Sequence, residues 1–219
     1  MVETQSISIL EMATKGGWIM IVLLILSIVA LYIFGKKWWI ISSAEKIDKD
    51  FMKDIKDYLL EGKVKSAKAL CGKFDSPIAR MIETGIARIG KPLSDVQTAV
   101  DNVGNAEIAR LENGLPYLAT IAGGAPMLGF LGTVTGMIKA FFNMANAGNN
   151  IDISLLSGGI YEAMITTVGG LIVGLIAYFA YNFLTAKVSN VVFKMENATI
   201  DFMSLLSETS GEQTETANE

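Results

Sequence analysis

Residues 155–186 read LLSGGIYEAMITTVGGLIVGLIAYFAYNFLTA and contain no Lys, Arg, Asp or His, and Glu162 is their only acid. A helix rises about 1.5 Å per residue, so a helix of this length can cross a bilayer core of roughly 30 Å with some tilt. An acid in hydrocarbon costs on the order of 3 kcal/mol on insertion scales, and it therefore normally faces a partner or a wet cavity. The block predicts a membrane-spanning helix whose carboxyl group serves a function.

Two further apolar blocks predict two more spans. Residues 17–35 end at the sequence KKWW (residues 36–39), and Lys and Trp at such a border are typical anchors of a spanning helix. The alternative for this block is a cleaved signal peptide, but no small-residue cleavage site follows it. Residues 117–142 form the other block, and their only charge is Lys139 near the far end, where a long side chain can reach the headgroups.

The distribution of basic residues sets the expected orientation in the membrane. Most of the 18 basic residues lie in segment 36–116, whereas the turn 143–154 contains none. The positive-inside rule therefore puts segment 36–116 and the C-terminus in the cytoplasm, and the N-terminus and the turn outside. Residues 1–16 are weakly amphipathic and are expected to form an interfacial segment on the periplasmic side.

Segment 36–116 has apolar residues at helical spacing, interrupted by glycines, and predicts several short helices. Ser76 and Pro77 are a typical helix start, in which a capping hydroxyl is followed by a first-turn proline. The helix that Pro92 opens meets no strong breaker before Gly114 and is expected to run on toward the second span.

The third span is expected to continue into the cytoplasm. Apolar residues recur at steps of three and four over residues 187–207, which predicts an amphipathic helix. Residues 208–219 are polar and acidic, and are expected to be disordered. The predicted fold class is an all-α membrane protein with three transmembrane helices, of which spans two and three extend into a helical cytoplasmic domain.

The composition excludes several classes of activity. The chain has no His, which removes His-based metal sites, a His proton relay, and Ser-His or Cys-His catalysis. Its one cysteine, Cys71, cannot form an internal disulfide. The net charge is −4, and no basic patch is dense enough for nucleic acid. We also expect no enzyme activity, no cofactor, no metal and no nucleic-acid partner.

Polar side chains within the second and third blocks are the candidate functional residues. Thr133 is expected at about the depth of Glu162, and Thr166 and Thr167 add two hydroxyls about one turn further along. Hydroxyls donate and accept hydrogen bonds, so this group could form a proton path or steady the carboxylate of a partner. On an ideal helix Thr166 lies about 40° from Glu162 and Thr167 about 140°, so the two threonines cannot both face one narrow lumen. The alternative is that Glu162 is an ordinary acid at headgroup level.

A second set of candidates concerns helix packing. Gly132 and Gly136, like Gly170 and Gly174, are small residues four apart, which let helix backbones approach closely in lipid. Pro126 lies within the second span, where a proline frees a carbonyl group and kinks the helix. These five residues predict close packing between the spans.

The glycine-rich motifs carry a resemblance to a known family. LENGLPYLATIAGGAPMLGFLGTVTGMIKAF (residues 111–141) and GGIYEAMITTVGGL (residues 158–171) are similar to the MotA/TolQ/ExbB proton-channel family, on its ExbB/TolQ side. The resemblance implies a homo-oligomer, usually a pentamer, around the spanning helix of an ExbD/TolR-type partner whose Asp takes and releases the proton. It also implies a TonB/TolA-type energy transducer and a location in the bacterial inner membrane.

By position in these motifs, the resemblance assigns the family's pore threonine to Thr133, its span-three glutamate to Glu162 and its span-three threonine to Thr167. Two positions depart from the family, since Gly158 replaces the usual proline and Tyr161 replaces a small residue. We interpret the chain as a proton-conducting motor subunit that couples the proton-motive force to TonB-dependent outer-membrane transport. The alternatives are a TolQ-like subunit for envelope maintenance, a scaffold that moves no ions, and a solute-translocating transporter subunit.

Overall fold

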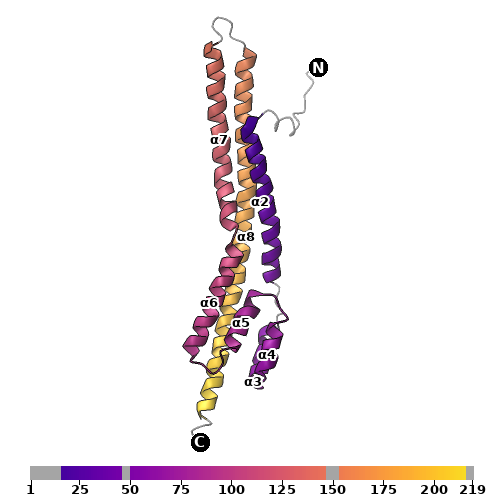
Figure 1. Ribbon diagram of the computed structural model, residues 1–219, viewed down its shortest axis with the longest axis vertical. Helices are drawn as coiled ribbons and strands as arrows, with labels where there is room; N and C mark the ends of the chain where they lie inside the picture. The colour runs from indigo at the N-terminus through magenta and orange to yellow at the C-terminus, as the bar shows by residue number, and fades with distance from the viewer. Residues whose placement is uncertain (1–15, 46–49, 147–152, 216–219) are drawn as a thin grey trace. The chain divides into compact units, whose positions relative to one another are not determined.

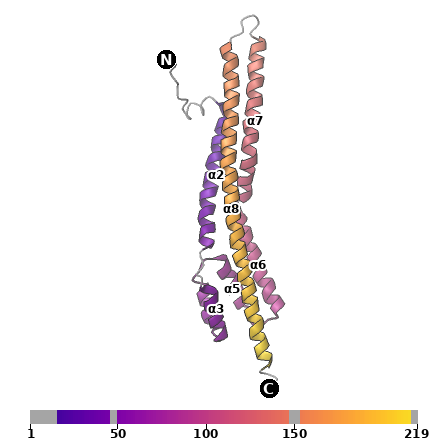
Figure 2. The same ribbon diagram turned by 180° about the vertical axis from the view of Figure 1, so that it is seen from behind.

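The computed structural model describes residues 16–45, 50–146 and 153–215, and within these ranges it contains helices and turns but no strand (Figures 1 and 2). The helices are, in chain order, α2 (Gly17–Ala44), α3 (Phe51–Leu60), α4 (Val64–Cys71), α5 (Pro77–Ile86), α6 (Leu93–Glu112), α7 (Leu115–Asn146) and α8 (Ile153–Glu215). Among the described residues, three helical stretches are long and apolar enough to cross a membrane: Gly17–Ala44, Leu93–Asn146 and Leu156–Glu208. The prediction of an all-α membrane protein is confirmed.

Local chemistry explains where two of the helices begin and end. Ser76 caps α5 as predicted, because its Oγ accepts a hydrogen bond from the N–H of Ala79 at 3.2 Å and Pro77 follows in the first turn. The helix predicted to start at Pro92 forms α6. It ends at Glu112 and does not continue into α7. Gly114 lies between the two with a φ of 94°, a left-handed conformation that favours glycine and breaks the helix.

Three predicted segments lie wholly or partly outside the described residues. The interfacial segment 1–16 is described only at Gly16, and the middle of the turn 143–154 is not described. The disordered tail expected over 208–219 is corrected in part, because α8 continues as a helix to Glu215. A helix that has already formed adds each further residue at little cost, which here overrides the polar composition.

The described residues form two compact units. The apolar unit comprises α2 as far as Lys36, α7, and α8 as far as Phe183. The charged unit comprises residues 37–113 and α8 from Leu184 onward. The two long helices α2 and α8 therefore contribute to both units.

Large apolar side chains of the apolar unit point outward. Phe130 is 67% exposed, Ile138 63% and Phe179 64%. In water such a surface would promote aggregation, whereas in a bilayer the lipid tails cover it and helices associate through close packing instead. Some interior positions between α7 and α8 are accordingly small, as at Ala125 and Ala163, which are fully buried.

The charged unit has a hydrophobic core of the kind found in water-soluble proteins. Phe51 of α3 lies edge-on to Phe74, with ring centroids 5.5 Å apart. Phe202 of α8 is buried against Gly85 of α5, where a methyl group in place of the hydrogen would overlap the ring. Helix α8 therefore supplies part of a core that the short helices are too small to complete alone.

Cys71 is expected to be unreactive in the folded protein. Its side chain is 2% exposed at the end of α4, and burial raises the pKa of the thiol to about 12. Since the thiolate is the reactive form, iodoacetamide near pH 8 should label Cys71 far more slowly in the folded chain than after denaturation. Mass spectrometry before and after addition of urea measures this, and rapid labelling of the folded chain would contradict it.

Candidate functional site

The candidate site lies along the line where α7 and α8 pack together, and the two helices run side by side in both views (Figures 1 and 2). We call this line the α7–α8 seam. Its residues face one another in antiparallel order: Pro126 opposite Gly174, Gly129 opposite Gly170, Gly132 opposite Thr166, Gly136 opposite Ala163, and Ala140 opposite Gly159. Nearly all are small, and steps of three or four residues keep them on one face of each helix.

The backbones touch at the centre of the seam, and glycine is required there. A Cβ on Gly170 would lie 2.6 Å from the carbonyl oxygen of Ala125 and 2.8 Å from the Cα of Gly129. A Cβ on Gly129 would lie 2.8 Å from the carbonyl oxygen of Thr166. Backbone atoms cannot move aside as the end of a flexible side chain can. The residues predicted for helix packing all lie on the seam: Pro126, Gly132, Gly136, Gly170 and Gly174.

Three threonines converge on the carbonyl group of Gly129. The Oγ1 atoms of Thr133, Thr166 and Thr167 lie 3.4, 3.5 and 3.2 Å from that oxygen. The hydroxyls of Thr133 and Thr167 also contact each other across the seam, and Thr133 donates to the carbonyl of Ala163 at 3.2 Å. The structure thus brings three of the four predicted polar residues together, and we call them the threonine group.

The members of the threonine group differ in exposure. Thr166 is 2% exposed, donates to the carbonyl of Ala163 at 2.8 Å and lies against Gly132, so its contribution is to packing. Thr133 and Thr167 are half-buried. Because a hydroxyl both donates and accepts, these two can bind a water molecule or the carboxyl group of a partner.

Glu162 lies outside the threonine group. Its Oε2 is 3.7 Å from the Nζ of Lys139 on α7, and its side chain is 32% exposed. Its Oε1 lies against Gly17 at the start of α2, 2.6 Å from where a Cβ of that glycine would be. Thr167 lies about 140° around the helix from Glu162, whereas Thr166 lies only about 40° around it but one turn, about 6 Å, further along the axis.

Sequence reasoning missed two residues of this region, Lys139 as the partner of Glu162 and Gly129 as the acceptor for the threonines. A signal for the first was present in the chain. Antiparallel helices joined by a short connection place residues equally far from that connection at the same depth. Lys139 precedes the end of α7 at Asn146 by nearly as many residues as separate Glu162 from the start of α8 at Ile153.

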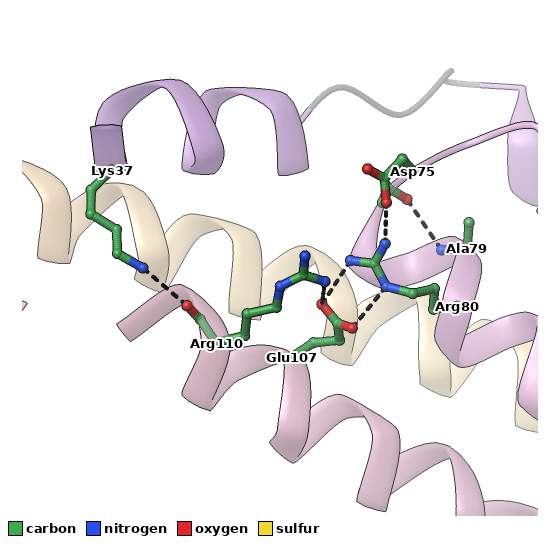
Figure 3. A network of polar contacts seen from close by, with 7 residues as sticks. Lys37, Asp75, Ala79, Arg80, Glu107 and Arg110 are labelled. Carbon is green, nitrogen blue, oxygen red and sulfur yellow. Dashed lines mark hydrogen bonds and ion pairs between the residues drawn. The ribbon is translucent and has the colours of Figure 1, made fainter. Parts of the chain in front are cut away.

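A second polar network lies in the charged unit (Figure 3). Arg80 donates two hydrogen bonds of 2.7 Å to Glu107, which is 9% exposed, and a third to Asp75. The hydrogen bonds to Glu107 are the main reason that the pKa of Arg80 is raised above its ordinary value. Lys37 donates to the carbonyl of Arg110 at 3.1 Å, near the C-terminal end of α6, where a cation is favourable.

A cavity of about 250 Å³ adjoins this network, with Asp75, Arg80, Glu107 and Arg110 among its lining. The two basic and two acidic groups balance, so the cavity favours neither an anion nor a cation. Among the described residues, no cluster of three or more acids or cysteines is arranged to hold a metal ion. The threonine group therefore remains the candidate site.

A small-residue seam with a polar centre, built on helices able to span a membrane, defines a helical membrane protein. The chain belongs to the MotA/TolQ/ExbB proton channel family, whose model matches residues 73–197. The match covers more than half of the chain and includes the whole α7–α8 seam.

Similar proteins lie on the ExbB/TolQ side of this family, as the motifs predicted. An ExbB-like protein 1 of Synechocystis sp. is 30% identical over 185 residues, which cover 84% of this chain and 73% of that protein. An ExbB homolog of Methanothermobacter thermautotrophicus is 27% identical over 193 residues, covering 86% and 67%. The Tol-Pal system protein TolQ of Haemophilus influenzae is 36% identical over 102 residues, covering 47% and 44%.

Proposed function

We propose that this chain is the ring-forming subunit of an inner-membrane motor that conducts protons and couples the proton-motive force to TonB-dependent outer-membrane transport. The family description, proton channel, and the ExbB-type names of two relatives support this proposal. The observation that carries it is the threonine group, in which three hydroxyls gather around the carbonyl group of Gly129 in a unit whose outer surface is rich in large apolar side chains.

The chemistry of the threonine group suits a proton carrier on another chain. The only acid in the described part of the apolar unit, Glu162, is engaged with Lys139 instead. A hydroxyl can accept a hydrogen bond from a protonated carboxyl and donate one to the ionised form. Thr133 and Thr167 therefore suit an Asp on the spanning helix of an ExbD/TolR-type partner, enclosed by a homo-oligomeric ring that we expect to be a pentamer. A TonB/TolA-type transducer would receive the energy that the proton flux releases.

The proposed orientation has the N-terminus in the periplasm and the C-terminus in the cytoplasm of a bacterial cell. Transmembrane segments 17–35, 117–142 and 155–186 would then cross the inner membrane. The concentration of basic residues in segment 36–116 supports this direction.

A TolQ-like role in envelope maintenance is the second candidate, and the similarity to TolQ of Haemophilus influenzae favours it. The ring and the threonine group would work in the same way in both roles. The roles differ in the energy transducer, so co-purification of the chain with a TonB-type or a TolA-type protein distinguishes them.

Thr133→Val and Thr167→Val are each expected to lower proton flux through the assembled complex roughly tenfold or more. Valine keeps the shape of threonine but lacks its hydroxyl, and a lost hydrogen bond of about 1.4 kcal/mol corresponds to a factor of ten in rate. The flux is measured with a pH-sensitive dye in proteoliposomes that contain the chain and its single-span partner, under an imposed membrane potential.

Thr135→Val is the matched control for these variants. Its hydroxyl is exposed and donates to the carbonyl of Leu131 in its own helix at 2.9 Å, so flux should be unchanged. If Thr133→Val and Thr135→Val conduct equally well, the threonine group is not on the proton path. A wild-type complex that assembles but carries no flux would support the scaffold alternative and refute the proposed function.

A further inference from the structure

Three helices of the apolar unit meet at Glu162. The Nζ of Lys139 on α7 lies 3.7 Å from one carboxylate oxygen, and the other oxygen lies against Gly17 in the first turn of α2. Within the described residues of this unit, the only other acidic or basic side chain is that of Lys36, at the opposite end of α2 in sequence. Apart from Lys36, Lys139 is therefore the only basic residue in the described part of this unit, and it pairs with Glu162.

Two properties of Gly17 favour its contact with the carboxylate of Glu162. Its φ is 65°, a left-handed conformation that favours glycine. A Cβ at Gly17 would lie 2.6 Å from Oε1 of Glu162, so any other residue would displace the carboxylate. The first N–H groups of a helix have no partner within it, and the positive end of the helix dipole favours an anion there. The carboxylate thus lies between an ammonium group and the start of a helix.

The ion pair lies on the flank of the α7–α8 seam. The residues next to it in the chain, Ala140 and Ala163, are themselves seam residues. A lone carboxylate at this position would be costly in lipid, whereas pairing with a base reduces that cost. Glu162 is held away from the threonine group. This geometry favours a role in positioning other groups over a role as proton carrier.

We propose that Lys139 is a positioning residue, which holds Glu162 against the start of α2 and so fixes α2 to α7 and α8. The contact between Lys139, Glu162 and the start of α2 keeps Thr167 opposite Thr133. Glu162 affects proton flux by holding these threonines in place and does not carry the proton itself. This inference rests on the proposed function, because proton flux is one of its readouts.

Lys139→Met and Glu162→Gln are each expected to lower proton flux about fivefold in the complete complex in proteoliposomes. Both changes break the same contact, the pair between Lys139 and Glu162. The double variant should therefore conduct protons no more slowly than either single variant. Lys139→Arg keeps the charge and should retain the flux. If Glu162→Gln abolishes the flux while Lys139→Met leaves it intact, Glu162 is the carrier and the inference is wrong; losses that multiply in the double variant also overturn it.

Thermal unfolding of the purified full chain in detergent separates this inference from the proposed function. The destabilisation by Lys139→Met and by Glu162→Gln should again fail to add, whether or not the complex conducts protons. Gly17→Ala should lower the unfolding midpoint more in the wild type than in a Glu162→Ala background, because the strain of the left-handed φ is common to both and only the contact with the carboxylate is removed. Additive effects in either pair of variants overturn the inference. A wild-type complex without flux overturns only the proposed function.

Discussion

Gly170→Val is expected to prevent the apolar unit from folding as a closely packed bundle. The new Cβ would lie 2.6 Å from the carbonyl oxygen of Ala125 and 2.8 Å from the Cα of Gly129, and both are backbone atoms. Overpacking of a core with side chains that can shift costs about 1–3 kcal/mol, and here no side chain can move to make room. We expect a loss of about 3 kcal/mol or more, seen as a lower unfolding midpoint in detergent and a lower yield of folded protein.

Gly124→Val is the matched control, since a Cβ at Gly124 meets nothing within 4 Å. The same change of residue type then carries only the small difference in helix propensity between glycine and valine. A midpoint close to that of the wild type is expected. If the variants at Gly124 and Gly170 lose the same stability, the backbone contact on the seam is not what limits packing, and the argument fails.

The architecture of the apolar unit was readable from sequence because length and hydropathy are properties of each block by itself. The spacing of Gly170 and Gly174 likewise predicted a packing face, since residues four apart share one side of a helix. Spacing alone does not say which residue of the other helix lies opposite. The structure supplies that register, with Gly170 facing Gly129 and Gly174 facing Pro126.

Sequence reasoning placed Thr133, Glu162, Thr166 and Thr167 in one region and expected Thr166 and Thr167 to face different ways. The structure brings these two threonines to the same carbonyl group and separates Glu162 instead. The threonines gather around Gly129, whereas Glu162 turns to Lys139 and Gly17. The helical angle between Glu162 and Thr167 already indicated two directions. Which residues Glu162 contacts depends on how α2 packs against α8. A sequence pattern within α8 carries no information about the packing of α2.

The network around Arg80 lay beyond sequence reasoning for a different reason. Arg80 and Glu107 are 27 residues apart and lie on separate helices, within a segment rich in charges of both signs. No local pattern separates Glu107 from the acids that remain exposed. Only the packing of α5 on α6 buries this acid while leaving Asp75 in solvent.

Glu107→Gln is expected to destabilise the charged unit by about 2 kcal/mol. Breaking a fully buried ion pair typically costs about 3–5 kcal/mol, and the value is lower here because Arg80 retains 31% exposure and its contact with Asp75. Cys71 provides the readout, since it is the only cysteine and is buried in the same unit. A loss of 2 kcal/mol would raise the alkylation rate about thirtyfold where labelling follows the equilibrium between closed and open forms.

Two further variants test whether the buried charge is the cause. Asp75→Asn should leave the labelling rate of Cys71 nearly unchanged, because the Asp75 side chain is 95% exposed and the pair it forms is screened by water. The double variant with methionine at both Arg80 and Glu107 should label more slowly than Glu107→Gln, because it leaves no uncompensated charge in the interior. If the double variant labels as fast as Glu107→Gln or faster, packing volume at this position governs stability and the electrostatic explanation is wrong.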